Sequence, residues 1–207
     1  MDEHVQAWGA DDIRKLDKSY RRNLINCLSG FKSACLLGSQ SLSGVNNLAL
    51  FSQVFHVGAN PPLMGVLFRP QVVPRHSLEN VRANRFFTLN HVHQDIYPQA
   101  HQTSARYDAD ESEFDAVGLE AEMLPGFSAP FVKEAHIKIG LIAKEFHTIL
   151  ANQTQLVVGE VVSLSIPSKA VGEDGFVYLD RLNTVTISGL DRYHKTEALE
   201  RLPYAKK

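Results

Sequence analysis

Short apolar runs rich in β-branched residues, separated by turn residues, dominate the chain from residue 33 onward. Gly38, Gly44 and Gly58 interrupt the first of these runs, and glycine is typical of turns between strands. Closely spaced strands favour antiparallel pairing, as in a sheet or barrel. The pattern therefore predicts a mainly β chain, with strands over 34–40, 48–57, 63–68, 87–92, 135–150, 155–166, 176–179 and 184–187.

Three segments have a different pattern. Apolar residues at helical spacing predict a peripheral helix over 11–22, within an N-terminal segment 1–30. A second helix is expected over 77–85, with Ser77 capping its first amides. Residues 97–130 are more polar and are expected to form a helical and loop insertion outside the sheet.

The composition is that of an ordinary globular protein. The chain has 207 residues, of which 44% are hydrophobic and 21% charged, so we expect one domain over 1–207 and exclude disorder and coiled coil. The 21 basic and 23 acidic residues give a formal charge of −2, which provides no basic field for nucleic acid or an anionic membrane. No apolar stretch is long enough for a membrane span. The expected ligand is a small molecule.

The cysteines and the first residues indicate the compartment. Cys27 and Cys35 form neither a CxxC pair nor a zinc pattern, so we expect free thiols in a reducing environment. Asp2 and Glu3 stand where a signal peptide would carry basic residues. Both observations favour the cytoplasm.

Two neighbouring asparagines are the first candidate for chemistry. Asn46 and Asn47 stand where a predicted strand begins, and their amides offer donors and acceptors suited to a polar heterocycle. The alternative is a hairpin turn with surface asparagines, which is a common arrangement.

A basic cluster is the second candidate. Arg69 ends a predicted strand, and Arg75, His76 and Ser77 precede a predicted helix. Free amides at a helix N-terminus bind anions, and guanidinium and hydroxyl groups add further donors. A phosphate could bind there; the alternative is an ordinary capped helix flanked by solvated arginines.

Three histidines raise the possibility of a metal site. His91 and His93 share one face of a predicted strand, and His101 follows nearby. Imidazoles at this spacing can bind zinc, copper or iron. No carboxylate or thiolate at ligand spacing completes the set, so hydrogen-bonded histidines are the favoured interpretation.

The order of several motifs resembles that of the flavin reductase-like family of FMN-binding split β-barrels. The resemblance extends from about Ser33 to the C-terminus, and it depends on motif order and spacing. The matching motifs are Gly44 with Asn47-Leu48-Ala49, Ser52, Phe55, Pro61-Pro62, Phe68-Arg69-Pro70, Arg75-His76-Ser77 with Asn80, Ser112-Glu113-Phe114 with Gly118-Leu119, Gly159-Glu160-Val161, and Gly189-Leu190-Asp191-Arg192-Tyr193.

This resemblance implies an antiparallel six-stranded split β-barrel with peripheral α-helices, in a homodimer that holds FMN near its interface. Main-chain groups of Asn47, Leu48 and Ala49 would face the isoalloxazine ring, with Ser52 nearby, and Arg69, Arg75 and Ser77 would hold the phosphate. The complete implied cofactor-binding set is Asn46, Asn47, Leu48, Ala49, Ser52, Phe68, Arg69, Arg75, His76 and Ser77.

The implied activity is acceptance of hydride from NADH or NADPH by the bound flavin, which passes electrons to an acceptor or to free flavin. NADH-using members of the family often carry a histidine at the position of Thr154, and His147 lies seven residues upstream of it. This departure keeps a second hypothesis open, in which the chain is a non-enzymatic flavin carrier or electron-transfer protein.

Overall fold

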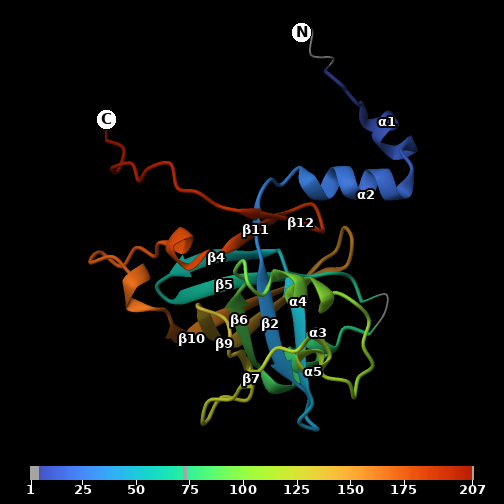
Figure 1. Cartoon of the computed structure of the whole chain (residues 1–207). Helices are drawn as coiled ribbons and strands as arrows, with labels where there is room; N and C mark the ends of the chain where they lie inside the picture. The colour runs from blue at the N-terminus through green and yellow to red at the C-terminus, as the bar shows by residue number, and fades with distance from the viewer. Residues whose placement is uncertain (1–4, 72–73, 207) are drawn as a thin grey trace.

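A seven-stranded antiparallel sheet forms the body of the protein (Figure 1). The computed structural model describes residues 5–71 and 74–206. The strand order is β3-β2-β6-β9-β10-β5-β4. The bounds are β2 (Cys35–Gln40), β3 (Asn46–Phe51), β4 (Val54–Ala59), β5 (Pro62–Phe68), β6 (Phe86–His91), β9 (Lys138–Ile149) and β10 (Thr154–Ser165).

The mainly β class is confirmed and most predicted strands form, but the main sheet has seven strands, so the count of six implied by the resemblance is not confirmed, and two predicted strands were wrong. The single strand expected over 48–57 is divided into β3 and β4, which lie at opposite edges of the sheet because β3 pairs with β2 and β4 with β5. The strand expected over 176–179 is only an isolated bridge at Val177, followed by the 3₁₀ helix η2 (Leu179–Leu182).

A smaller sheet joins the start of the barrel to the end of the chain. β1 (Lys32–Ser33) pairs with β11 (Val185–Ser188), and β11 pairs with β12 (Arg192–Lys195). The apolar pattern did not indicate β12. The strand β12 reads Arg-Tyr-His-Lys and has no buried residue. A strand without an apolar face gives no periodic signal to detect.

Alternate residues of β2 belong to two different hydrophobic clusters. Cys35 and Leu37 pack with Phe87, Leu89 and residues of β9 and β10, whereas Leu36 packs with the helices and β11. This alternation follows from the two-residue period of a strand, and burial of each large apolar side chain stabilises the fold by about 1.5–3 kcal/mol. Because β2 is buried on both faces, its pairing with β3 ties that edge strand to the core.

The N-terminal helices lie outside this body. α1 (Ala10–Lys15) and α2 (Lys18–Cys27) contain no buried residue and project away from the barrel in Figure 1. The predicted single helix is broken because Leu16 is extended and the Asp17 carboxylate accepts hydrogen bonds from the Ser19 and Tyr20 amides, at 2.8 and 3.1 Å, starting a new helix. No helix in the described ranges is long and apolar enough to cross a membrane.

Three further helices lie beside β2 and β3. They are α3 (His76–Asn84), α4 (Tyr97–Gln102) and α5 (Glu113–Val117). The 97–130 segment also forms β7 (Ala121–Glu122), which pairs with β8 (Phe131–Val132), and η1 (Ser168–Ala170) follows β10. The expected Ser77 cap was wrong: α3 begins at His76 with Arg75 as its N-cap, so Ser77 lies within the first turn, and its hydroxyl donates to Asn47 instead.

Candidate functional site

The Asn47 side chain is the centre of a buried polar network that links β3 to α3 and α5. Its Nδ2 donates to both carboxylate oxygens of Glu113, at 2.7 and 2.9 Å. Its Oδ1 accepts from Ser77 Oγ at 2.6 Å and from Ser39 Oγ at 3.2 Å. An asparagine amide has two N–H donors and two lone pairs, and all four are used here.

Glu113 is a member of this network to which, as for Ser39, the sequence analysis gave no role. Besides the two bonds from Asn47, its carboxylate accepts the Leu48 main-chain N–H at 2.8 Å. Burial raises the pKa of Glu113, and the hydrogen bonds from Leu48 and Asn47 and the charge of His76 act in the opposite direction. The only sequence signal was its place in the motif Ser112-Glu113-Phe114.

The network continues into α3 and β2. Asn80 Nδ2 donates to Ser39 Oγ at 3.3 Å, and both residues are buried. On the other side of β3, Gln40 Nε2 donates to Asn46 Oδ1 at 2.9 Å, and Asn84 Nδ2 donates to the Gln40 carbonyl. The polar side chains at the start of β3 are therefore held by the neighbouring strand β2 and by the helices α3 and α5.

The arginines at the start of α3 are arranged very differently. The Nε of Arg75 is buried and has no hydrogen-bond partner among the residues that the structure describes. Burial lowers the pKa of Arg75, and so do the positive charges of Arg69 and of Arg106, which the sequence analysis did not single out. Among the residues described, none of the three arginines forms an ion pair.

A buried donor without a partner costs about 1–3 kcal/mol, and the crowding of like charges adds to that cost. An anion bound between Arg69, Arg75 and Arg106 would remove both penalties. The N-terminus of α3, which Arg75 caps, adds main-chain N–H groups and the positive end of a helix dipole. The residues present therefore fit a phosphate group.

A cavity of about 210 Å³ lies against the N-terminal half of α3. Asn47 and His76 line it, so the structure brings together one residue from each of the two clusters predicted from sequence. The rest of the lining comprises hydroxyl, carboxylate, amide and apolar side chains, including the acids Glu79 and Glu111. These acids make the cavity suitable for hydroxyl-bearing parts of a ligand, whereas the arginine cluster provides the charge that attracts an anion.

The other residues of the predicted set occupy varied positions. Phe68 is buried in the core, where its ring packs edge-on against Phe51 with centroids 4.7 Å apart. Ala49 is partly buried on β3, and Ser52 is partly buried where that strand ends. The Leu48 side chain is fully buried, and its N–H is engaged by Glu113, so a contact between Leu48 and a ligand must use other atoms.

The three histidines considered as metal ligands do not converge. His93 Nε2 lies 3.0 Å from the Glu134 carbonyl, whereas His101 Nδ1 lies 3.0 Å from the Tyr193 hydroxyl. Burial lowers the pKa of His91 to about 4. Within the part of the chain that is described, no three His, Cys, Asp or Glu side chains are grouped to hold a metal ion.

Thr154 and His147 lie in the hairpin of β9 and β10. Thr154 begins β10, and its N–H donates to Asn152 Oδ1 at 3.1 Å. His147 is exposed on β9, where its Nε2 lies 2.6 Å from a Glu145 carboxylate oxygen. The structure therefore places an imidazole on this hairpin, but not at the start of β10.

Comparison with solved structures gives similar folds over nearly the whole chain. A candidate flavin reductase with a split barrel domain from Shewanella frigidimarina NCIMB 400 is 49% identical, with a TM-score of 0.94 over 97% of this chain and 100% of the other. Nitrilotriacetate monooxygenase component B from Bacillus cereus is 20% identical, with a TM-score of 0.84 over 96% and 100% of the two chains.

A third structure is that of an FMN-binding protein from Thermus thermophilus, which is 17% identical, with a TM-score of 0.69 over 84% of this chain and 90% of the other. At such low identity this match and that of the Bacillus cereus protein show the fold alone. The family model for the flavin reductase like domain matches residues 32–185, from β1 to the first residue of β11. The chain therefore belongs to the flavin reductase-like family of flavin-linked oxidoreductases, with the split-barrel fold.

Proposed function

We propose that the protein is an FMN-binding oxidoreductase of the flavin reductase type, which takes hydride from NADH or NADPH and passes electrons to an acceptor or to free flavin. The observation that carries the proposal is the arginine cluster of Arg69, Arg75 and Arg106, with its buried and unpartnered Nε of Arg75. A flavin that ends in a phosphate provides the charge that this cluster lacks.

The roles of the residues follow from their positions. Arg69, Arg75 and Arg106 bind the phosphate, and the Asn47 and His76 side of the cavity faces the hydroxyl-bearing part of the ligand. The edge of β3 at Asn46, Leu48 and Ala49 supports the ring, since β3 is an edge strand in the described part of the chain. When bound, the flavin supplies the hydride-accepting chemistry, and the protein orients the reactants.

We also propose a homodimer with FMN near its interface. Exposed apolar side chains on and after α2 support a contact with a second copy, because exposed apolar area of this kind marks interaction sites. These side chains include Tyr20, Ile25, Leu28 and Phe31. Free Cys27 and Cys35 support a reducing cytoplasmic setting.

A non-enzymatic flavin carrier or electron-transfer protein is the second candidate function. The observation that favours it is Thr154, which replaces an ionisable histidine with a hydroxyl at the start of β10. The neighbouring His147 is already paired with Glu145. In this alternative the protein binds FMN through the same residues but does not react with nicotinamide at a useful rate.

Two measurements on the purified protein test the proposal. Titration with FMN and with riboflavin, followed by flavin fluorescence, should show tighter binding of FMN, because only FMN carries the phosphate. Stopped-flow mixing of the FMN-bound protein with NADH or NADPH should then bleach the flavin absorbance within seconds. Persistent oxidised flavin would favour the carrier, and a failure to bind FMN would reject both functions.

A further inference from the structure

We propose that Glu113 is a positioning residue that sets the spacing between the ring-binding and phosphate-binding halves of the site. The inference rests on the proposed FMN site and extends it to a residue that does not itself touch the ligand. The carboxylate accepts three hydrogen bonds from β3, and through Asn47 these bonds lead to the first turn of α3.

The hydrogen bonds around the carboxylate are those that an ionised group accepts, and they act against the burial that raises its pKa. Both of its oxygens face N–H donors, two from Asn47 Nδ2 and one from Leu48 N, at 2.7 to 2.9 Å. Glu113 is only 6% exposed, and hydrogen bonds to a charged group in such surroundings are the stronger ones. A glutamine at this position would direct its own N–H₂ group at one of these donors, so the interaction depends on the charge as well as the shape.

The same contacts connect β3, which we assign to the flavin ring, with α3, which we assign to the phosphate. Leu48 lies on the edge strand that we assign to the ring, whereas Ser77 lies beside Arg75, which we assign to the phosphate. Asn47 bridges them, because its Nδ2 is held by Glu113 and its Oδ1 by Ser77. Glu113 thus holds the Nδ2 end of the Asn47 amide while Ser77 holds the Oδ1 end, and together these contacts set the position of β3 against α3.

The consequence is measurable as coupling between the two halves of a ligand. A ligand with both a ring and a phosphate gains affinity only if the protein holds the two subsites at the matching distance, which is the preorganisation effect. Riboflavin lacks the phosphate, so the ratio of FMN affinity to riboflavin affinity reports that coupling. A residue with only a structural role would change stability and leave this ratio unaltered.

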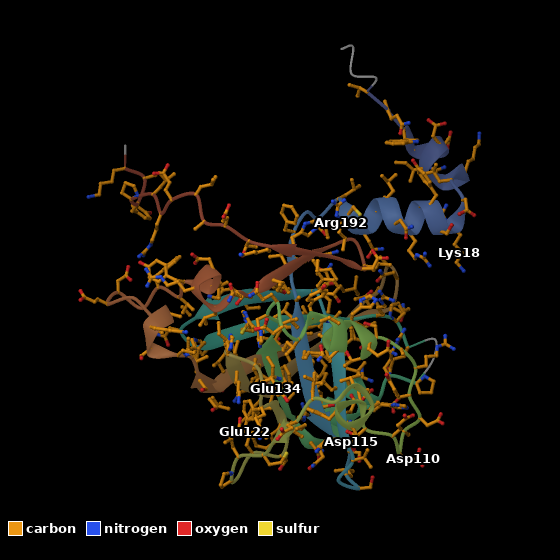
Figure 2. All side chains as sticks on the ribbon, viewed as in Figure 1. Lys18, Asp110, Asp115, Glu122, Glu134 and Arg192 are labelled. Carbon is orange, nitrogen blue, oxygen red and sulfur yellow. The ribbon has the colours of Figure 1, made fainter. Side chains whose placement is uncertain are left out.

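The experiment compares wild-type protein with Glu113→Gln, and with Asp115→Asn as the matched control. Asp115 lies two residues further along α5, is exposed, and is seen in Figure 2 at the end of the body away from α1 and α2. We expect Glu113→Gln to lower the FMN-to-riboflavin ratio about tenfold or more, as for a lost charged hydrogen bond, and to change the visible circular dichroism of bound FMN. Asp115→Asn should change neither.

Glu113→Asp serves where the glutamine variant does not fold, because it keeps the charge and withdraws the carboxylate by one methylene. A ratio intermediate between wild type and Glu113→Gln, or below wild type where only Glu113→Asp folds, would support the inference. An unchanged ratio in a folded variant would overturn it and leave the proposed function standing. Failure of the wild-type protein to bind FMN would overturn both.

Discussion

The two halves of the candidate site differ in whether their polar groups have partners inside the protein. Around Asn47, the donors and acceptors of the side chain are all paired inside the protein, with Glu113, Ser77 and Ser39. Around Arg75, a buried donor has no partner within residues 5–71 and 74–206, and two more arginines add unfavourable positive charge. Both regions are polar and adjoin the N-terminus of α3. Among the described residues, only the second lacks a hydrogen-bond partner for a buried donor and a negative charge to balance its arginines.

This difference distinguishes residues that stabilise the fold from residues that bind a ligand. A completed network stabilises the fold and specifies one arrangement of its elements. An unpaired cluster costs stability in the free protein and recovers that cost only when a complementary group binds. Substitutions in the Asn47 network should therefore change folding stability as well as the spacing of the two subsites, whereas substitutions in the arginine cluster should change mainly ligand affinity.

The largest effect is expected from Asn47→Asp. The substitution replaces the Nδ2 donor with an oxygen that faces the Glu113 carboxylate, so two acids would share a buried site. We expect a loss of about 3–5 kcal/mol in the free energy of unfolding, as for an uncompensated buried charge. Urea denaturation of the ligand-free protein measures it, and the loss should shrink at acid pH, where one carboxyl group can be protonated.

Asn46→Asp is the matched control one residue earlier on β3. Asn46 Oδ1 accepts from Gln40 Nε2 at 2.9 Å, and a carboxylate oxygen can accept the same bond. Asn46 is only partly buried, so the change should alter the free energy of unfolding by about 0.5 kcal/mol or less. Equal losses in the two variants would show that the Asn47 network contributes no more to the free energy of unfolding than the hydrogen bond of Asn46 does.

The sequence predicted this site unevenly, for physical reasons. Strands such as β2 and β9 were predictable because their apolar residues follow a local pattern, and Asn47, Arg75 and Ser77 were found because they stand at the ends of such elements. Glu113 and Arg106 lie in the 97–130 insertion, and their partners are distant in sequence. A residue whose role depends on a contact 66 positions away leaves no periodic signal in its own neighbourhood.

Arg75→Ala should have an intermediate effect, on binding and not on folding. Loss of a charge-assisted hydrogen bond to the phosphate should weaken FMN by about 1.5–3 kcal/mol. The free energy of unfolding without ligand should stay constant or rise slightly, since the substitution removes an unpartnered donor and the repulsion by Arg69 and Arg106.

Equilibrium titration and urea denaturation measure the two quantities on the same sample. Arg82→Ala is the control, because Arg82 lies near the other end of α3 and its guanidinium bonds Gln155 Oε1 at 2.8 Å. It should lower stability without changing FMN affinity. Unchanged FMN affinity in Arg75→Ala would remove that residue from the phosphate site.

The smallest effect is a pH dependence within the satisfied network, due to Glu113. Because burial raises its pKa, the native protein binds a proton here more tightly than the unfolded chain does. Its contribution to stability is then complete below the ordinary glutamate pKa of 4.5, and it declines as the pH rises through the higher native value. The slope is at most about 1.4 kcal/mol per pH unit for one group.

The difference in unfolding free energy between wild type and Glu113→Gln isolates this dependence, because the other titrating groups cancel. The stability of the wild type relative to Glu113→Gln should fall as the pH rises from 4.5 and then become constant. If the relative stability of the wild type rose over that range instead, the three N–H donors would lower the pKa of Glu113 more than burial raises it. The Asn47 network would then gain stability from the charge it holds, and its contrast with the arginine cluster would be sharper still.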